Sequence, residues 1–167
     1  RQLLTFSRKQ IVRPVELNVN TTLQSFRPLL GQLLDDTVKL DVQLVGHMAD
    51  VRLDPGQLEQ IVMNLVLNAR DAITGSGQVR VRTENVTINH KTDLSSWALP
   101  PRIGEYVAIS VSDNGSGIAR ASLHAIFEPF FSTKEPDKGT GLGLAVVHGI
   151  VRQCNGGLIV ESKENHG

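Results

Sequence analysis

Residues 54–73 read DPGQLEQIVMNLVLNARDAI and carry the strongest helix signal in the chain. Asp54 is expected to cap this helix, with Pro55 in the first helical position and Gln57 completing an arrangement like a capping box. Apolar residues at helical spacing predict its buried side. They are Leu58, Ile61, Leu65, Ala69 and Ile73. Gly75 is expected to end the helix.

Three polar residues of this helix fall on one narrow arc. Asn64, Asn68 and Asp71 follow one another at i, i+4 and i+7, so at about 100° per residue they share an arc of about 60°. The arc borders the apolar stripe, which predicts that the carboxamides lie at a half-buried rim. Carboxamide oxygens at such a rim can ligate a hard cation such as Mg²⁺. Alternatively, they bond only to nearby backbone groups.

Segments on both sides of this helix predict further strands and helices. Period-two alternation of apolar residues predicts strands over 15–19, 38–44, 51–53, 79–88, 106–111 and 158–161. Further helices are expected from a cap at Asn20 or Thr21 to about residue 34, over 121–127 and over 140–154. The last is apolar nearly all round and should be well buried. A loop containing Trp97 should join two strands. This order predicts an α/β two-layer sandwich, one sheet with helices on one face.

A second motif, Asp113-Asn114-Gly115-Ser116-Gly117, directly follows a predicted buried strand. The Asp113 carboxylate can accept a hydrogen bond from an exocyclic amine, and the two glycines let the backbone approach a planar ligand. The same residue types are strong turn formers, so a turn without a ligand is the alternative interpretation.

A third motif, Gly139-Thr140-Gly141-Leu142-Gly143-Leu144, opens the apolar helix. Free amide groups at a helix start favour anions, so this stretch predicts a phosphate-binding loop. It is not a Walker loop, because the chain has no Gly-Lys pair, and it fits a Rossmann motif poorly. Before it, residues 127–134 read FEPFFSTK and suggest a mobile flap. Lys134 suits a lid over a polyphosphate, although a surface loop pinned by its aromatic residues is the alternative.

The composition excludes several classes of protein. Lys and Arg number 17, as do Asp and Glu, so the net charge is zero, whereas sequence-independent nucleic-acid binding needs a basic excess. The longest stretch without a charged residue, Gly139 to Val151, is shorter than the roughly 18 residues of a membrane helix. We therefore expect no direct membrane contact. Cys154 is the only cysteine, which excludes an internal disulfide and is compatible with the cytosol.

The order of the motifs is informative. An asparagine-bearing helix, a strand followed by Asp-x-Gly-x-Gly, Phe-x-Pro-Phe, and Gly-x-Gly-x-Gly opening a helix together resemble the ATP-binding catalytic domain of bacterial sensor histidine kinases. This domain belongs to the superfamily of gyrase, the Hsp90 chaperones and the MutL proteins. Asn68-Ala69-Arg70-Asp71-Ala72, with residues 127–134, looks most like the hybrid or nitrogen-regulation-type kinases. The resemblance implies a Bergerat-type fold with a mixed, mostly antiparallel sheet.

The resemblance also implies the domain boundaries. Residues 14–167 should form the ATP-binding catalytic domain without its last strand, because relatives continue past Gly167 into a final sheet strand. Residues 1–13 look like the end of the helical dimerisation and phosphoacceptor hairpin.

ATP and Mg²⁺ are the cofactors that the resemblance implies. Asn68 should hold Mg²⁺ against the triphosphate with Asn64 beside it, Asp113 should bind the adenine amine, and Lys134 should contact phosphate from the lid. Asn64, Asn68 and Lys134 are the implied catalytic residues. The implied nucleotide-binding residues are Asn68, Asp71, Asp113, Gly115, Gly117, Ile118, Phe127, Thr133, Lys134, Gly139, Thr140, Gly141, Leu142, Gly143 and Leu144.

Two residues of the asparagine helix depart from the family pattern. Many relatives carry lysine where this sequence has Asp71, so one phosphate contact is lost. Arg70 points about 160° away from Asn68 and cannot simply replace that lysine. Asn64 stands where gyrase-type ATPases carry the glutamate that activates water, which favours phosphoryl transfer over hydrolysis.

The expected function is a protein-histidine kinase catalytic domain that phosphorylates a histidine outside this chain. Its partners would be its own dimerisation domain and a response regulator or receiver domain. The full-length kinase is expected to be a cytoplasmic or membrane-anchored homodimer, and this fragment a monomer. A hydrolysing ATPase clamp of the same superfamily and a non-catalytic nucleotide-sensing module are the alternatives.

Overall fold

The computed structural model describes residues 12–133 and 140–167. Its longest helix, α2 (Pro55–Ala72), begins at the predicted cap. Oδ1 of Asp54 accepts hydrogen bonds from the N–H groups of Gly56 and Gln57, at 2.8 and 3.3 Å. Oδ2 accepts the N–H of Arg13 at 2.7 Å. One carboxylate therefore caps α2 and ties the preceding chain to it.

Helix α1 (Val19–Gln32) starts earlier than the sequence predicted. Its cap is Asn18, whose Oδ1 accepts the N–H of Thr21 at 3.3 Å. Asn20 and Thr21, the expected caps, lie inside the first turn. The side-chain amide of Asn18 also donates to the carbonyl oxygen of Met48 at 3.1 Å, a contact that local sequence does not reveal.

The strands form three small sheets within the described residues, so the expectation of a single sheet is wrong. Strand β4 (Gly77–Ile88) lies between β2 (Val38–Gln43), which is parallel to it, and β6 (Gly104–Asp113), which is antiparallel. The other pairs are both antiparallel. They are β1 (Val15–Asn18) with β3 (Asp50–Leu53), and β5 (Trp97–Leu99) with β7 (Leu158–Ile159). The pairing is therefore mixed and mostly antiparallel, as the resemblance implied.

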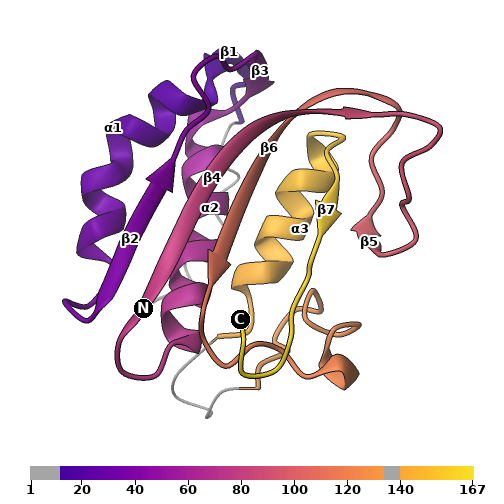
Figure 1. Ribbon diagram of the computed structural model, residues 1–167. Coiled ribbons are helices and arrows are strands. Elements are labelled where there is room, and N and C mark those ends of the chain that lie inside the picture. The colour runs from indigo at the N-terminus through magenta and orange to yellow at the C-terminus, as the bar shows by residue number, and fades with distance from the viewer. Residues whose placement is uncertain (1–11, 134–139) are drawn as a thin grey trace.

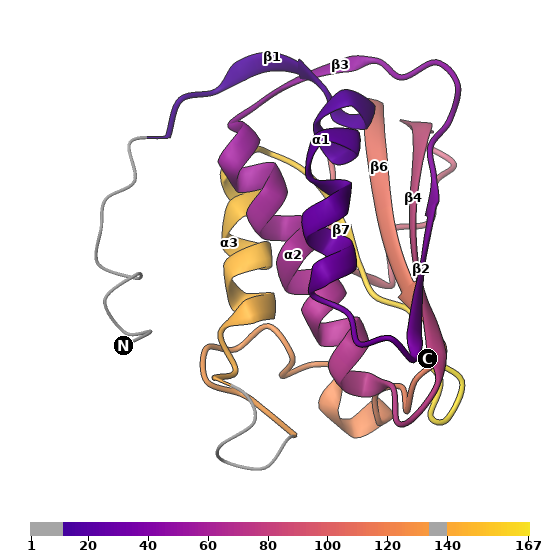
Figure 2. The ribbon, with the colours of Figure 1, turned by 90° about the vertical axis from the view of Figure 1, so that its left-hand side faces the viewer.

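The three α-helices of the described residues lie on one face of the β2–β4–β6 sheet, which confirms the two-layer architecture (Figures 1 and 2). Helix α2 contacts α1, α3, β4 and β6. Its fully buried residues include Val62 and Val66, whereas Ile61 and Leu65 of the predicted stripe are only half-buried. Leu58 and Ala69 of that stripe are buried as predicted, and the burial extends to Val62 and Val66 because α2 is covered on several sides. The most deeply buried core residues are Val19, Leu23, Leu30, Leu58, Val62, Val66, Val79, Val81 and Val147.

Several elements differ from the predicted ones. Strand β5 lies in the segment read as a loop, because its partner β7 comes from the far end of the chain. Residues 121–127 do not form a helix, since a 3-10 helix, η2 (Arg120–Ser122), is followed by turns. Helix α3 (Gly143–Gln153) is shorter than 140–154 at both ends, and β7 ends at Ile159. Gln57 makes one bond of the expected capping box, because its N–H donates to Oδ1 of Asp54, while its side-chain amide donates to Gln153 at 3.4 Å.

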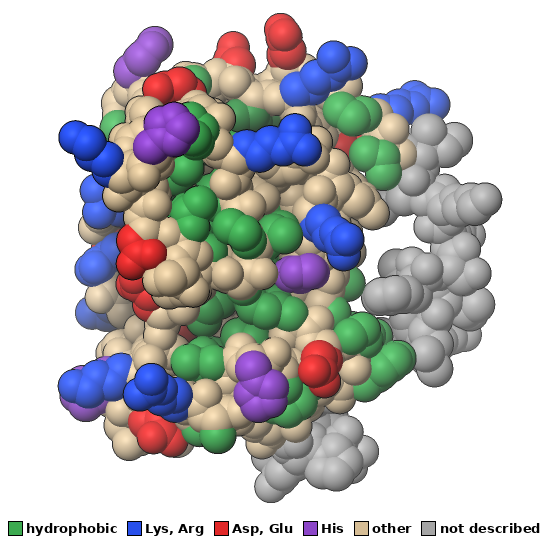
Figure 3. Space-filling view, turned by 90° about the vertical axis from the view of Figure 1, so that its right-hand side faces the viewer, with side chains coloured by type: hydrophobic (Ala, Val, Ile, Leu, Met, Phe, Trp, Pro, Cys, Tyr) green, Lys and Arg blue, Asp and Glu red, His purple; other side chains and the backbone are tan. Residues whose placement is uncertain are grey.

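Helix α3 is less buried than its apolar sequence predicted. Only Val147 and Ile150 of this helix are buried, and its main contact is α2. Hydrophobic side chains spread across the middle of the face on which α3 and β7 lie (Figure 3). Within the described part of the chain, no helix combines the length and the hydropathy needed to cross a bilayer.

Replacing Asp54 with alanine should lower the free energy of unfolding by about 1 kcal/mol at neutral pH, as expected for a lost N-cap. The hydrogen bond from the Arg13 N–H, with those from the first turn of α2, lowers the pKa of Asp54 below its ordinary value of 3.8. The folded state thus favours the ionised carboxylate, and this contribution is lost as the pH falls through the lowered folded-state pKa. Denaturant unfolding at neutral pH and at about pH 3 measures the difference between the two chains, which should shrink in acid.

The control for this prediction is Gln60→Ala, an exposed position on the same helix. It should change stability little at either pH. An Asp54→Ala chain as stable as the unmutated one at neutral pH would contradict the capping role.

Candidate functional site

The two asparagines predicted on α2 meet the first residue of α3. A Cβ placed on Gly143 would lie 3.5 Å from Nδ2 of Asn68 and 3.7 Å from Oδ1 of Asn64. Both asparagines are half-buried, beside the buried positions of the same helix. The predicted rim therefore exists, and it faces the glycine-rich motif from the far end of the sequence.

Asn68 carries a buried polar atom without a partner. Its Nδ2 is the one buried side-chain nitrogen or oxygen that lacks a hydrogen bond in the described part of the chain. Leaving such a donor unpaired costs about 1–3 kcal/mol, so the position fits a missing acceptor. A 180° turn of the amide presents its oxygen, which is a ligand for Mg²⁺. No three His, Cys, Asp or Glu side chains of residues 12–133 and 140–167 gather as a metal site, so a cation here needs phosphate oxygens or water as further ligands.

Helix α3 begins without a side-chain cap. Its N-cap residue is Leu142, whose side chain makes no capping hydrogen bond to the first turn. Uncapped N–H groups and the positive end of the helix dipole together favour an anion. The buried Asn68 amide faces this same helix start, so two independent features point to an anionic ligand between α2 and α3.

The glycine motif is held against the predicted flap at Gly141. This residue has a φ of +66°, which favours glycine, and an added Cβ would lie 2.5 Å from the carbonyl carbon of Phe130. The N–H of Phe130 donates to the carbonyl oxygen of Gly141 at 3.0 Å. Phe130 itself has a φ of +68° and a 72% exposed surface. The close approach therefore fixes the backbone where the flap begins.

The Asp113 motif forms a turn at the end of β6. Oδ1 of Asp113 accepts the N–H of Gly115 at 2.8 Å. The N–H of Ser116 donates to the carbonyl oxygen of Ala72 at 2.9 Å, which docks the turn on the C-terminal end of α2. A Cβ on Gly115 would lie 2.5 Å from that same oxygen, so glycine is required by packing. The half-buried Asp113 thus lies beside the end of the helix that carries Asn68.

The remaining predicted residues are distributed around the start of α3 and the turn that follows β6. The N–H of Ile118 donates to Oγ of Ser162 at 2.8 Å, and Gly117 packs against the backbone of Lys163. The ring of Phe127 lies 5.5 Å from the ring of His148 on α3. Thr133 and Thr140 are exposed, whereas Leu142 and Leu144 are half-buried. Lys134 and Gly139 lie outside the described residues.

Sequence reasoning missed the role of Arg70. Its Nη1 donates to the carbonyl oxygen of Leu33 at 2.9 Å, and its Nε and Nη2 donate to Oδ1 of Asp71 at 2.9 and 2.6 Å. The sequence indicated only that Arg70 points away from Asn68. No pattern in the chain marks Leu33, which ends α1, as its partner.

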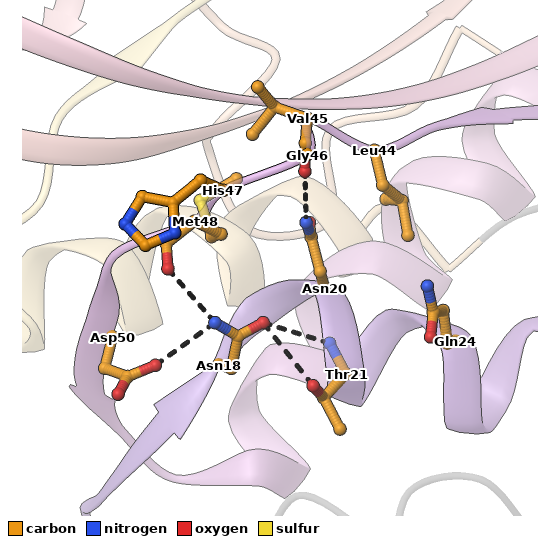
Figure 4. Close-up of a pocket in the computed structure, with 10 residues that line it drawn as sticks. All are labelled: Asn18, Asn20, Thr21, Gln24, Leu44, Val45, Gly46, His47, Met48 and Asp50. Atoms are coloured by element: carbon orange, nitrogen blue, oxygen red, sulfur yellow. Dashed lines mark hydrogen bonds between the residues drawn. The ribbon is translucent and has the colours of Figure 1, made fainter.

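A separate polar hollow of about 540 Å³ lies between the start of α1 and the loop from β2 to β3 (Figure 4). It contains none of the predicted site residues. Asn18 donates to the carbonyl oxygen of Met48 and to Oδ1 of Asp50, both at 3.1 Å, and Asn20 donates to the carbonyl oxygen of Val45 at 2.7 Å. Since its polar groups are largely bonded to one another, they serve to fix this loop. We therefore place the candidate site between α2 and α3.

Comparisons with known proteins identify the family of this chain. Residues 53–167 match the sequence model of the family described as Histidine kinase-, DNA gyrase B-, and HSP90-like ATPase. The sensor kinase CckA of Brucella abortus is 41% identical over 167 residues, which cover 100% of this chain and 18% of that protein. The sensor histidine kinase ZraS of Escherichia coli is 35% identical over 167 residues, covering 95% of this chain and 31% of that protein. The chain thus spans less than a third of the length of these relatives.

Solved structures share the fold. The catalytic domain of the histidine kinase ThkA superposes with a TM-score of 0.58 at 23% identity, over 85% of this chain and 82% of that one. ThkA in complex with the response regulator protein TrrA gives a TM-score of 0.65 at 22% identity, over 99% of this chain and 42% of that one. At these identities the likeness establishes the fold alone.

Gly143→Ala tests whether the ligand lies between α2 and α3. The added methyl group meets Asn68 and Asn64 at ordinary contact distances of 3.5 and 3.7 Å, so the free energy of unfolding should stay within about 1 kcal/mol of the unmutated value. Because the methyl group fills the space between them, ATP binding measured by calorimetry should weaken about tenfold or more.

Gly149→Ala on the same helix is the matched control. A Cβ there meets nothing within 4 Å, so alanine should stabilise the chain by about 0.5–1 kcal/mol and leave ATP binding unchanged. Equal ATP affinities of the two variants would contradict the location of the site.

Proposed function

This chain belongs to the family of histidine kinase-, DNA gyrase B- and HSP90-like ATPases and is the catalytic ATP-binding domain of a histidine kinase, and from that premise we propose that it binds Mg-ATP and transfers the γ-phosphoryl group to a histidine on a separate dimerisation domain. The observation that carries the proposal is the buried, unpaired amide of Asn68, which faces Gly143 at the uncapped start of α3. An uncharged hydrogen-bonding group and an electropositive helix end suit a polyphosphate with its cation.

The proposal assigns the adenine end of the nucleotide to the turn after β6. Asp113 accepts a hydrogen bond from the adenine amine, Gly115 and Gly117 give access to the backbone, and Ile118 and Phe127 supply apolar contact. The support is the position of the half-buried Asp113 beside the end of α2. Selectivity for adenine then comes from the free-energy cost of leaving this carboxylate unpaired when the amine is absent.

The phosphate end is assigned to the start of α3. The N–H groups of Gly141, Leu142, Gly143 and Leu144 bind phosphate oxygens, and Gly139, Thr140, Thr133 and Lys134 complete the loop and the lid. Asn68 holds Mg²⁺ with Asn64 beside it. When bound, Mg²⁺ neutralises the charge that develops on the transferring phosphoryl group. The chain's own contribution is to bind and orient the triphosphate.

The acceptor histidine is proposed to lie outside this chain. Transfer breaks the bond from the γ-phosphorus to the oxygen that bridges it to the β-phosphate, leaves ADP, and forms a phosphorus–nitrogen bond on an imidazole that gives up a proton. In the family an acidic residue follows the acceptor and helps to remove that proton. This sequence has five histidines, and in none of them is the next residue Asp or Glu. They are His47, His90, His124, His148 and His166.

The proposal extends to the domain boundaries and partners. Residues 14–167 are assigned to the catalytic domain, and residues 1–13 to the end of the dimerisation hairpin. Of the latter, residues 1–11 lie outside the described part of the chain. The partners are that hairpin in a homodimer and a response regulator or receiver domain downstream. The crystallised complex of ThkA with TrrA supports the second partner by analogy. Because the proposed reaction uses ATP, the proposal assigns this domain to the cytoplasm.

Two variants should distinguish the proposed Mg²⁺ contact from the proposed adenine contact. Asn68→Ala removes the proposed Mg²⁺ ligand, so its ATP affinities with and without Mg²⁺ should converge while adenosine binding is retained. Asp113→Asn keeps the shape but loses the charged acceptor, so adenosine and ATP should both bind about tenfold more weakly with the Mg²⁺ effect intact. Titrations in Mg²⁺ and in EDTA measure both effects. A full Mg²⁺ effect in Asn68→Ala, or equal binding of ATP and GTP by the unmutated chain, would refute the respective assignment.

The transfer step is tested with labelled ATP. We expect acid-labile label on a purified dimerisation hairpin of the full-length kinase when this chain is added, and no label on this chain alone. Label on the chain itself would overturn the assignment of the acceptor. Phosphate release without a hairpin would favour a hydrolysing ATPase, against which the uncharged Asn64 argues because it cannot act as a base. Binding with neither reaction would favour a nucleotide-sensing module.

A further inference from the structure

The turn that carries Asp113 is tied to β4 by the side chain of the residue that follows it. Oδ1 of Asn114 accepts the N–H of Gln78, the second residue of β4, at 2.8 Å. We propose that Asn114 is a positioning residue, which holds the turn so that the Asp113 carboxylate meets the exocyclic amine of adenine. This inference rests on the proposed function, because it assumes that Asp113 binds that amine.

The bond from Gln78 to Asn114 continues the sheet at the point where the backbone leaves it. The antiparallel pairs of β4 and β6 end with Val79 opposite Asp113, so Gln78 and Asn114 would form the next pair. In such a ladder the bonded groups are backbone N–H and carbonyl groups. Here the side-chain oxygen of Asn114 takes the place of a carbonyl oxygen. The backbone after Asp113 can therefore turn away while Asp113 keeps its place at the end of the sheet.

The position of the Asn114 side chain depends on a glycine in β4. A Cβ placed on Gly77 would lie 2.7 Å from Oδ1 of Asn114 and 2.6 Å from Cγ2 of Ile73, too close for either contact. The absence of a side chain at residue 77 therefore lets the amide oxygen reach the backbone of β4. The N–H of Gly77 itself donates to the carbonyl oxygen of Thr37 at 3.1 Å. This end of β4 is thus fixed and can serve as an anchor for the turn.

The second attachment of the turn lies farther from Asp113. The N–H of Ser116 donates to the carbonyl oxygen of Ala72 on α2, three residues beyond Asp113. The Asp113 carboxylate accepts the N–H of Gly115, so it moves with the turn. Asn114 lies between Asp113 and Gly115, and its bond to β4 therefore fixes the part of the turn that directs the carboxylate. Because hydrogen bonds weaken steeply as their angle departs from linearity, a small rotation of the turn would weaken the bond to the amine.

The test compares adenosine with purine riboside, the same nucleoside without the exocyclic amine. Asn114→Ala removes the bond to Gln78, so adenosine should bind about tenfold more weakly, as expected when a hydrogen bond to a charged group is misaligned. Purine riboside has no amine to lose and should bind as before, so the preference for adenosine falls by the same factor. Asn114→Asp keeps an oxygen for the N–H of Gln78 and should retain the preference. Both nucleosides are uncharged, so the added carboxylate does not repel them.

The matched control is Asn85→Ala on the same strand. The amide of Asn85 donates to the carbonyl oxygen of His47 at 2.8 Å, and its Oδ1 accepts the N–H of Ala49 at 3.2 Å. Asn85 and Asn114 are both exposed. The control variant therefore loses the same kind of bond between a side chain and the backbone, but near the opposite end of β4. It should leave the affinities for both nucleosides unchanged.

Calorimetric titration of each nucleoside, at a temperature where a thermal melt shows each variant folded, distinguishes the outcomes. A purely structural role of Asn114 would change both affinities equally or neither, so an unchanged preference for adenosine in Asn114→Ala would overturn the inference. Loss of the preference in Asn114→Asp would also overturn it, and this variant remains informative if Asn114→Ala fails to fold. Absence of ATP binding by the unmutated chain would instead overturn the proposed function, and equal affinity of that chain for the two nucleosides would overturn its assignment of Asp113. The inference would fall with either.

Discussion

The burial of α2 is the constraint on which the rest of the molecule depends. Leu58, Val62 and Val66 have no exposed surface, because this helix packs against two strands and both other α-helices. Such packing fixes the rotation of the helix about its axis, and the rotation places Asn64 and Asn68 at the rim that faces α3. A rotation by one residue, about 100°, would put a leucine there instead. The hydrophobic core therefore determines where the polar chemistry lies.

Two glycines that look alike in the sequence meet different requirements. Gly115 is needed because the backbone of Ala72 leaves no room for a side chain. A side chain on Gly143 would meet only carboxamides at ordinary distances, so the glycine there leaves space that the packing of the protein does not use. The fold requires the first glycine, whereas it leaves room for a side chain at the second. What an added Cβ would touch distinguishes the two cases.

Local chemistry made much of this molecule predictable. The cap at Asp54 and the rim position of Asn64 and Asn68 follow from spacing within one segment, and all are present in the structure. The predictions were wrong where the local structure depends on contacts with a segment that is distant in the sequence. Asn18 caps α1 while also bound to the loop before β3, and β5 is a strand because β7 pairs with it. The link from Arg70 to the end of α1 likewise joins residues that no spacing rule relates.

The parallel pairing of β2 with β4 has a consequence for synthesis of the chain. β4 and β6 are successive strands of the central sheet and can pair as a hairpin, whereas β2 reaches β4 only through a crossover that contains β3 and α2. Synthesis from the N-terminus delivers Asn64 and Asn68 well before Gly143, which faces them. The nucleotide site that we propose between α2 and α3 is therefore incomplete in a nascent chain until α3 has emerged and docked. A bound nucleotide can thus stabilise only the finished fold, by mass action, and gives no help to partly made chains.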